Sequence, residues 1–224
     1  MANHKLLVNK TYVEIGGVKW ATMNIGANSE TDYGLYFQWG DTAGYKSWQC
    51  GSSSTSYKKP FNWNDYKFGN GTTSDSESAF TKYNGNDNKT TLDEWNDAAV
   101  ANWGGKWRMP TTDEFIALGN ATIFIDSGGT EITGSDKRTT LSGVTGIYLQ
   151  DKTDTNKKLF FPVAGYGGNG SMNLVGSDGY YWSSSLHTSN KAGAYFLHFY
   201  SLNVVWQNYG TRRSGFSVRP VLDS

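Results

Sequence analysis

The chain of 224 residues contains one cysteine, so no disulfide can form within it. Its 20 lysines and arginines are balanced by 20 aspartates and glutamates, which leaves no charge excess to attract nucleic acid or an anionic membrane. No run approaches the ~20 apolar residues of a membrane-spanning helix. We therefore expect neither a nucleic-acid partner nor insertion into a membrane.

Reactive side chains are also scarce. The three histidines, His4, His187 and His198, are too scattered in the sequence to indicate a metal site. There is no G-x-S-x-G motif, and the glycine-rich GYGGNG at 165–170 lacks the strand and helix that flank a phosphate loop. We expect no catalytic activity, no bound metal ion and no cofactor.

Two oxygen-rich stretches, GNGTTSDSES at 69–78 and NGNDNK at 84–89, offer ligands of the kind that calcium prefers. Neither has the ligand spacing of an EF-hand loop, and Asn, Asp and Gly also form tight turns. Trp95, Asn96 and Asp97 spell the WND triplet of animal lectins, but the companion EPN or QPD triplet is missing. We interpret the stretches as turns and the triplet as a coincidence inside a helix.

What the chain has in quantity is glycine, at 27 residues, and aromatic side chains, at 15%. This mixture is typical of a loop-rich fold held together by buried rings, and we expect Trp20, Tyr36 and Trp39 in the core. The length suffices for a sizeable core, and we favour a single domain over residues 1–224. Residues 45–89 are rich in Ser, Thr, Asn, Gly and Lys, which predicts an irregular insert whose rings dock onto the body.

Turn residues and apolar runs predict the strands. Residues 11–24 have the pattern of a hairpin, with two short apolar runs around Gly16 and Gly17. Further apolar runs, bounded by polar and glycine-rich turns, predict strands near 123–125, 147–149 and 159–166.

Two capping boxes predict two helices. The first helix is expected over residues 91–103, where Thr91 and Glu94 have the S/T-x-x-E spacing. The second is expected to begin at Thr111, which forms the same box with Glu114. Helices in the middle of the chain and strands at both ends predict an α+β fold.

The C-terminal stretch 179–221 has a middle part suited to display. Over 194–203 the residues alternate, so a strand there would have one core face and one face that carries large aromatic groups. An exposed aromatic strip usually marks a binding surface. The two predicted faces are Tyr195, Leu197 and Phe199, and Phe196, His198, Tyr200 and Leu202.

Several segments carry a family resemblance, and both ends of the chain take part. They are GYYWSSS (179–185), RRSGFSVRPV (212–221), IGGVKWATMNIGA (15–27), YGLYFQWGDT (33–42), WGGKWRMPT (103–111) and LFFPVAGY (159–166). They resemble the bacterial major paralogous domain first described in Fibrobacter succinogenes. The resemblance implies a C-type-lectin-like, formylglycine-generating-enzyme-like fold, with twisted antiparallel sheets, two helices and long irregular inserts. Because both ends of the chain carry it, we also expect the terminal strands to pair in one sheet. The enzymes of that group use a cysteine pair, which this chain lacks, so their activity is not implied.

The same ending resembles the variable proteins of diversity-generating retroelements, which occur in phages and gut bacteria. There, errors opposite template adenines turn Asn codons into codons ending in C or T, so Trp and Gln cannot arise. The resemblance thus implies that Trp206 and Gln207 are fixed, and that Arg212 and Arg219 are framework. The ligand-binding positions it implies are His187, Phe196, His198, Tyr200, Leu202, Val205, Asn208, Tyr209, Gly210, Thr211, Arg213 and Ser214.

The resemblance implies a ligand-binding display protein, located on a phage virion or a bacterial cell surface, whose partner is a protein or glycan on a cell. We expect a monomer, with an oligomer left open. The N-terminal MANHKLLVNKTYVEIGG contains no signal peptide. The alternative is a fixed carbohydrate-binding or adhesin domain of a gut bacterial surface protein.

A specific expectation follows for the surface. The predicted patch faces solvent as one unit, unless the insert at 45–89 covers it. Its members are Phe196, His198, Tyr200, Leu202, Tyr209 and Arg213.

Overall fold

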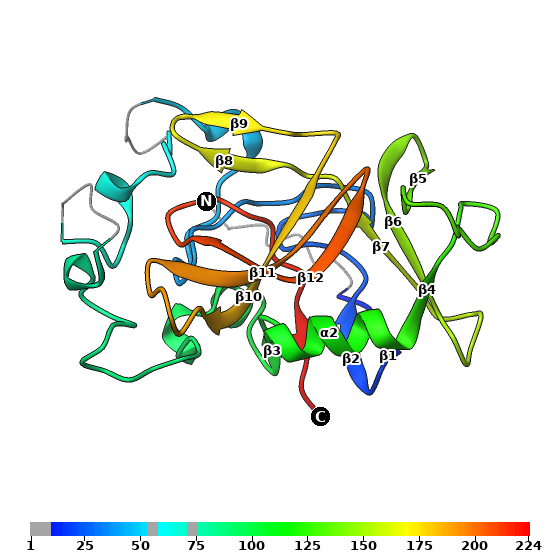
Figure 1. Ribbon diagram of the computed structural model, residues 1–224, viewed down its shortest axis with the longest axis horizontal. Helices are drawn as coiled ribbons and strands as arrows, with labels where there is room; N and C mark the ends of the chain where they lie inside the picture. The colour runs from blue at the N-terminus through cyan, green and yellow to red at the C-terminus, as the bar shows by residue number, and fades with distance from the viewer. Residues whose placement is uncertain (1–9, 53–57, 71–75) are drawn as a thin grey trace, which may run out of the picture.

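A computed structural model describes residues 10–52, 58–70 and 76–224, and Figure 1 shows its arrangement. The fold is α+β, with mostly antiparallel sheets and the two helices α1 (Ala98–Trp103) and α2 (Thr112–Ala121). The strands are β1 (Tyr12–Ile15), β2 (Val18–Ala21), β3 (Trp107–Arg108), β4 (Thr122–Phe124), β5 (Arg138–Leu141), β6 (Val144–Asp151), β7 (Lys158–Pro162), β8 (Tyr166–Gly168), β9 (Ser171–Asn173), β10 (Gly179–Leu186), β11 (Gly193–Tyr200), β12 (Asn203–Thr211) and β13 (Val221–Leu222).

The two ends of the chain meet in the sheet β1-β2-β13-β3. The β1–β2 hairpin turns at Gly16 and Gly17, whose φ angles of +61° and +77° favour glycine. Val221 of β13 lies opposite Trp20 of β2 on one side and Arg108 of β3 on the other. The predicted hairpin and the predicted pairing of the terminal strands are both confirmed.

The sheet β10-β11-β12 lies in the centre of the molecule, and α2 runs along one of its faces (Figure 1). The helix approaches β12 closely at Gly119, because a Cβ there would lie 2.5 Å from the Trp206 ring. The N-terminus of α2 is capped by Thr111, which accepts from the Glu114 N–H, while the Glu114 carboxylate accepts from the Thr111 N–H. This capping box is the predicted one.

Four of the remaining strands form a third sheet, in which β6 pairs with β4, β5 and β7. The other two, β8 and β9, form a separate hairpin. These strands confirm the ones expected near 123–125, 147–149 and 159–166. The hairpin lies at the top of Figure 1, on the side of the central sheet away from α2.

Two clusters of buried side chains lie on opposite faces of the central sheet. Phe196 of β11 belongs to the first, together with Trp39 and Trp182, whereas the alternating Leu197 and Phe199 belong to the second, beside α2. Trp20, Tyr36 and Trp39 are all 1% exposed or less, as predicted.

The described part of the insert at 45–89 has short 3-10 turns and isolated bridges, and it forms the left side of the molecule in Figure 1. Its rings dock onto the body as predicted, with Trp63, Tyr66, Phe80 and Tyr83 buried in the first cluster. Trp48 is the exception, since it is 67% exposed.

The first helix begins later than predicted. Thr91 lies in a bridge to Ser185 and caps nothing, and α1 starts only after Asp97, whose carboxylate accepts from the Ala99 and Val100 N–H groups. The Asp97 carboxylate also accepts the Met109 N–H and so fixes the start of the helix to the residue that follows β3. This long-range bond outcompetes the local Thr91 signal. The WND triplet therefore precedes the helix: Trp95 and Asn96 lie in a 3-10 turn, Glu94–Asn96, and Asp97 is the N-cap of α1.

Both framework arginines are completely buried. Arg219 donates to the Asn24 side-chain oxygen and to the Ala21 and Phe160 carbonyls, while Arg212 donates to the Tyr83 carbonyl at 3.1 Å. Burial lowers the pKa of Arg219 to about 10, which leaves the guanidinium charged at neutral pH. Both arginines are therefore buried in the scaffold, as the resemblance implied.

Candidate functional site

The predicted display face lies on β11, and it emerges gradually from the core. Phe196 is only 4% exposed, His198 and Tyr200 are half-buried, and Leu202 in the following turn is 71% exposed. The prediction that Phe196 faces solvent is wrong. Its ring packs against Trp182 and Phe216 at centroid distances of 5.6 and 4.8 Å.

Three rings form a column on this face. The Tyr180 and His198 rings stack at 4.4 Å and 18°, and the His198 and Tyr200 rings at 5.1 Å and 23°. Tyr166 of β8 closes the inner end, edge-on to Tyr180 at 5.0 Å. We call Tyr166, Tyr180, His198, Tyr200 and Asn208 the His198 surface.

Polar neighbours fix the orientation of the His198 ring. Its Nε2 lies 3.3 Å from the Asp178 carboxylate, and its Nδ1 lies 3.3 Å from the Asn208 amide nitrogen. The Asn208 side-chain oxygen is occupied by the Tyr209 N–H, so the amide nitrogen faces the histidine. If the Asn208 amide donates to Nδ1, the ring proton lies on Nε2 and is directed at Asp178.

His187, Tyr195 and Tyr209 form a second ring cluster, which we call the His187 cluster. The His187 ring lies 4.1 Å from Tyr209 and 5.0 Å from Tyr195. Tyr195 lies three residues before His198 in β11, so the two side chains point to opposite faces of the sheet. Tyr209 of β12 lies opposite Tyr195, and the His187 cluster therefore occupies the face away from His198. The expectation of one patch that joins Tyr209 to His198 is therefore wrong, because the period of two separates them.

The other predicted positions have varied surroundings. Gly210 lies against the Phe196 ring, where a Cβ would come within 3.0 Å. Arg213 is half-buried and donates to the Asn169 side chain at 2.7 Å. Ser214 is only 8% exposed and its hydroxyl lies 3.1 Å from that of Thr211, which leaves little of it for a ligand. Val205 is half-buried opposite His198.

The two positions expected to be fixed differ. Trp206 packs against α2 and lies 6.2 Å from the Phe124 ring, as a framework residue should. Gln207 is exposed, in the part of β12 where the register to β11 shifts.

Sequence reasoning missed Tyr166, Asp178 and Tyr180. Tyr180 belongs to GYYWSSS and Tyr166 to LFFPVAGY, two segments that carry the family resemblance but contain none of the implied ligand-binding positions, and Asp178 lies in the polar stretch before GYYWSSS. The alternation of side chains in a strand could have found Tyr180. It directly precedes Tyr181, which is buried, so its side chain points to the opposite face of the sheet.

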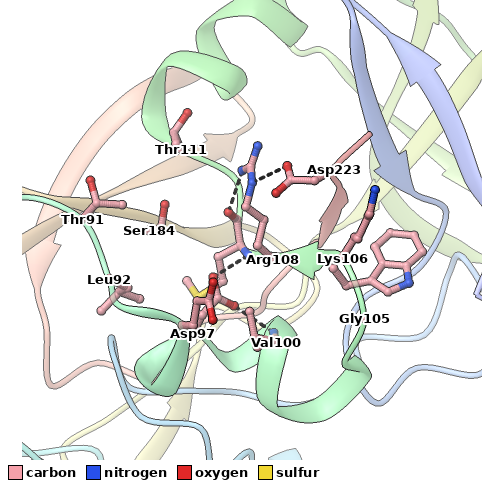
Figure 2. A pocket seen from close by; sticks show the side chains of 13 residues that line it. Thr91, Leu92, Asp97, Val100, Gly105, Lys106, Arg108, Thr111, Ser184 and Asp223 are labelled. Atoms are coloured by element: carbon pink, nitrogen blue, oxygen red, sulfur yellow. Dashed lines mark hydrogen bonds and ion pairs between the residues drawn. The ribbon is translucent and has the colours of Figure 1, made fainter.

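A separate hollow lies beside α1, β3 and the start of α2 (Figure 2), and its volume is about 320 Å³. Arg108 there binds Glu114 and Asp223 at 2.6 and 2.7 Å, and Asp97 accepts three backbone N–H groups. Burial raises the pKa of Asp97, although those three bonds oppose the increase. These charged groups bind one another and the backbone, so the hollow is a structural junction.

The oxygen-rich turn at 84–89 is organised by Asp87, whose carboxylate accepts from the Asn84 and Lys89 N–H groups. This is the turn chemistry that we expected. Part of the stretch at 69–78, like His4, lies outside the described residues. Within 10–52, 58–70 and 76–224, no three His, Cys, Asp or Glu side chains converge as a metal site.

A family model matches part of the chain. It is described as a domain of unknown function (DUF8237) and covers residues 130–221, which is less than half of the sequence. The matched range contains β5 to β12 and therefore the His198 surface. No curated protein and no solved structure matches the chain. Across the described residues, no helix is long and apolar enough to cross a membrane.

Proposed function

We propose that the chain is a ligand-binding display protein of the retroelement-diversified kind, built on a C-type-lectin-like fold. The observation that carries this proposal is the His198 surface, a column of half-buried rings on the central strands. The pairing of the chain ends, the α2 helix on the central sheet and the buried Arg212 and Arg219 are the features that the family resemblance implies.

The His198 surface suits binding because it is held in place before a ligand arrives. Asp178 and Asn208 fix the His198 ring, and the stacked tyrosines restrict one another. Side chains that are already ordered lose little entropy on association, and Tyr and His offer large contact area with few rotatable bonds. The exposed Leu202 adds an apolar group at the outer end of the column.

We place the ligand, a protein or glycan on a cell, against this surface, with the protein carried on a phage virion or a bacterial surface. Fixed carbohydrate binding is the second candidate. It is favoured by Trp48 and Trp95, whose side chains are 67% and 81% exposed and leave indole surface for a sugar ring. In the His198 surface, by contrast, the rings cover one another's faces.

The flanking DNA separates the two candidates. A display protein of this kind requires a nearby near-copy of the last ~130 bases that differs only opposite adenines, beside a reverse-transcriptase gene. Sequencing the locus on both sides tests this. A locus without either feature would contradict the retroelement proposal and favour the fixed carbohydrate-binding domain.

A binding experiment tests the surface itself. The fluorescently labelled chain is mixed with a panel of gut bacterial strains, and cell binding is measured by flow cytometry. Changing His198 and Tyr200 together to serine should abolish binding and shift the melting temperature by only a few degrees, since both side chains are half-buried. Tyr12→Ser is the matched control, an exposed tyrosine on β1. Equal binding by the double variant and the control would contradict the proposed surface.

A further inference from the structure

The strand β12 forms an edge of the central sheet, since β11 is its partner on one side and no described strand pairs with the other. Its sequence NVVWQNYGT contains no proline and no charged residue, the usual devices that protect an exposed edge against pairing with another chain. The side chains of Asn203 and Leu202 at its start are exposed. The sequence of this edge therefore does not prevent it from pairing with another strand.

The backbone at Val204 points away from β11. Val204 lies directly opposite Phe199 in the ladder, but its N–H donates to the side-chain oxygen of Asn203 at 2.8 Å and not to Phe199. In an antiparallel pair, a residue whose N–H leaves the ladder also directs its C=O outward. Rotation of the exposed Asn203 side chain would free the N–H, so Val204 can offer a donor and an acceptor to an added strand.

A groove of about 400 Å³ runs beside this edge. One wall is the start of β12, and the other is the loop that precedes β5, which contributes Ser135 and Lys137. The Phe124 and Trp206 rings also line it and lie 6.2 Å apart. Lys137 is the charged side chain among the described lining residues, and its ammonium group lies 5.5 Å above Phe124 and donates to the Ile132 carbonyl.

We infer that the β12 edge and this groove bind an extended peptide segment of a partner protein, added to the sheet beside Val204. Main-chain hydrogen bonds supply affinity in strand addition, and pockets for alternate side chains supply selectivity. The ring pair suits an apolar side chain of the peptide, and Lys137 suits an acidic one. The register shift at Trp206 and Gln207 ends the regular edge and limits the pairing to a few residues.

A second copy of the chain fits the groove less well than a peptide. Pairing of β12 with its own copy would bring two loops of residues 133–137 into the same space, because each loop lines the edge of its own strand. A single extended peptide needs only the groove. The inference goes beyond the proposed function, since the groove is lined by Trp206 and Val204 rather than by the His198 surface.

The first test uses a phage-displayed library of linear peptides, selected against the immobilised full-length chain. Enriched peptides are synthesised and N-methylated at one amide at a time, and their affinity is measured by calorimetry. Strand addition predicts losses of about tenfold at alternate amides only, since each methyl group there removes one main-chain hydrogen bond. Losses without alternation, or no enriched peptide, would overturn the inference.

The second test changes the protein. Val204→Pro removes the outward N–H without removing a bond to β11, and it should weaken the selected peptides about tenfold. Lys137→Glu should weaken acidic peptides about two- to fivefold, while the exposed Lys152→Glu should not. Unchanged affinity in Val204→Pro overturns the inference; if that variant does not fold, the methylation pattern on the natural chain decides.

Two further outcomes keep this inference separate from the proposed function. Serine at both His198 and Tyr200 should leave peptide affinity unchanged, so loss of cell binding alone concerns only the His198 surface. Light scattering tests for dimers of the chain. Dimers that form with rising concentration and are lost in Val204→Pro would show that a second copy occupies the edge, and would contradict a peptide as its occupant.

Discussion

The strands β10 and β12 belong to the same sheet and have similar numbers of apolar residues, yet their surroundings differ. Along β10, GYYWSSSL, even the serines Ser183 and Ser184 are buried, whereas along β12, NVVWQNYGT, no residue is fully buried. The first strand is covered on both faces and meets the body at its edge, and the second lies at the rim. Both are edge strands of this sheet, so the cover that other segments supply, rather than hydrophobicity, makes one strand buried and the other partly exposed.

The two largest expected effects are of similar size and concern fully buried side chains, and the first of these is Arg219. Arg219→Ala leaves the Ala21 and Phe160 carbonyls and the Asn24 side chain without their donor, and we expect a loss of about 4 kcal/mol in the free energy of unfolding. Arg213→Ala, after β12, removes a half-exposed side chain and should cost less than ~1 kcal/mol. Urea unfolding measures both. An unchanged stability in Arg219→Ala would break the comparison.

A matched pair of tryptophans sharpens the comparison. Trp182 of β10 is fully buried and its indole donates to the Phe37 carbonyl at 2.9 Å, so Trp182→Ala should cost about 3–5 kcal/mol. Trp206 of β12 is half-buried against α2, and Trp206→Ala should cost about 1–2 kcal/mol. Thermal or chemical unfolding of the two variants gives the difference, and equal losses would mean that β12 is as much framework as β10.

The smallest effect is electrostatic and lies in α2, which supports both strands. Burial raises the pKa of Glu114, but the bonds from Arg108 and Thr111 outweigh it and hold the pKa below its usual value. The ionised pair therefore stabilises the fold above the unfolded pKa of about 4.3, and this stability is lost as the pH falls through the folded pKa. We expect a loss of about 1 kcal/mol.

Glu114→Gln provides the control for this pH dependence. The variant should be less stable at pH 7 and should show a shallower decline in unfolding free energy below pH ~4 than the natural chain. Identical pH profiles for the two proteins would show that the Arg108 pair contributes nothing measurable.

The sequence by itself determined those features that depend on neighbouring residues. The Gly16-Gly17 hairpin, the Thr111 capping box and the alternation along β11 each follow from local backbone geometry, and the structure has all three. The family resemblance added the two buried arginines, because its motif contains them.

Only the tertiary structure decided which of the alternating rings meet solvent. Phe196 and His198 have the same place in the period, but Phe216 and Trp182 cover the first, whereas Asp178, brought by the β9–β10 connection, holds the second at the rim. Likewise Asp97 outcompeted Thr91 as a helix cap through its bond to the Met109 N–H, just after β3. Burial and long-range hydrogen bonds depend on segments distant in the chain, so no local pattern contains them.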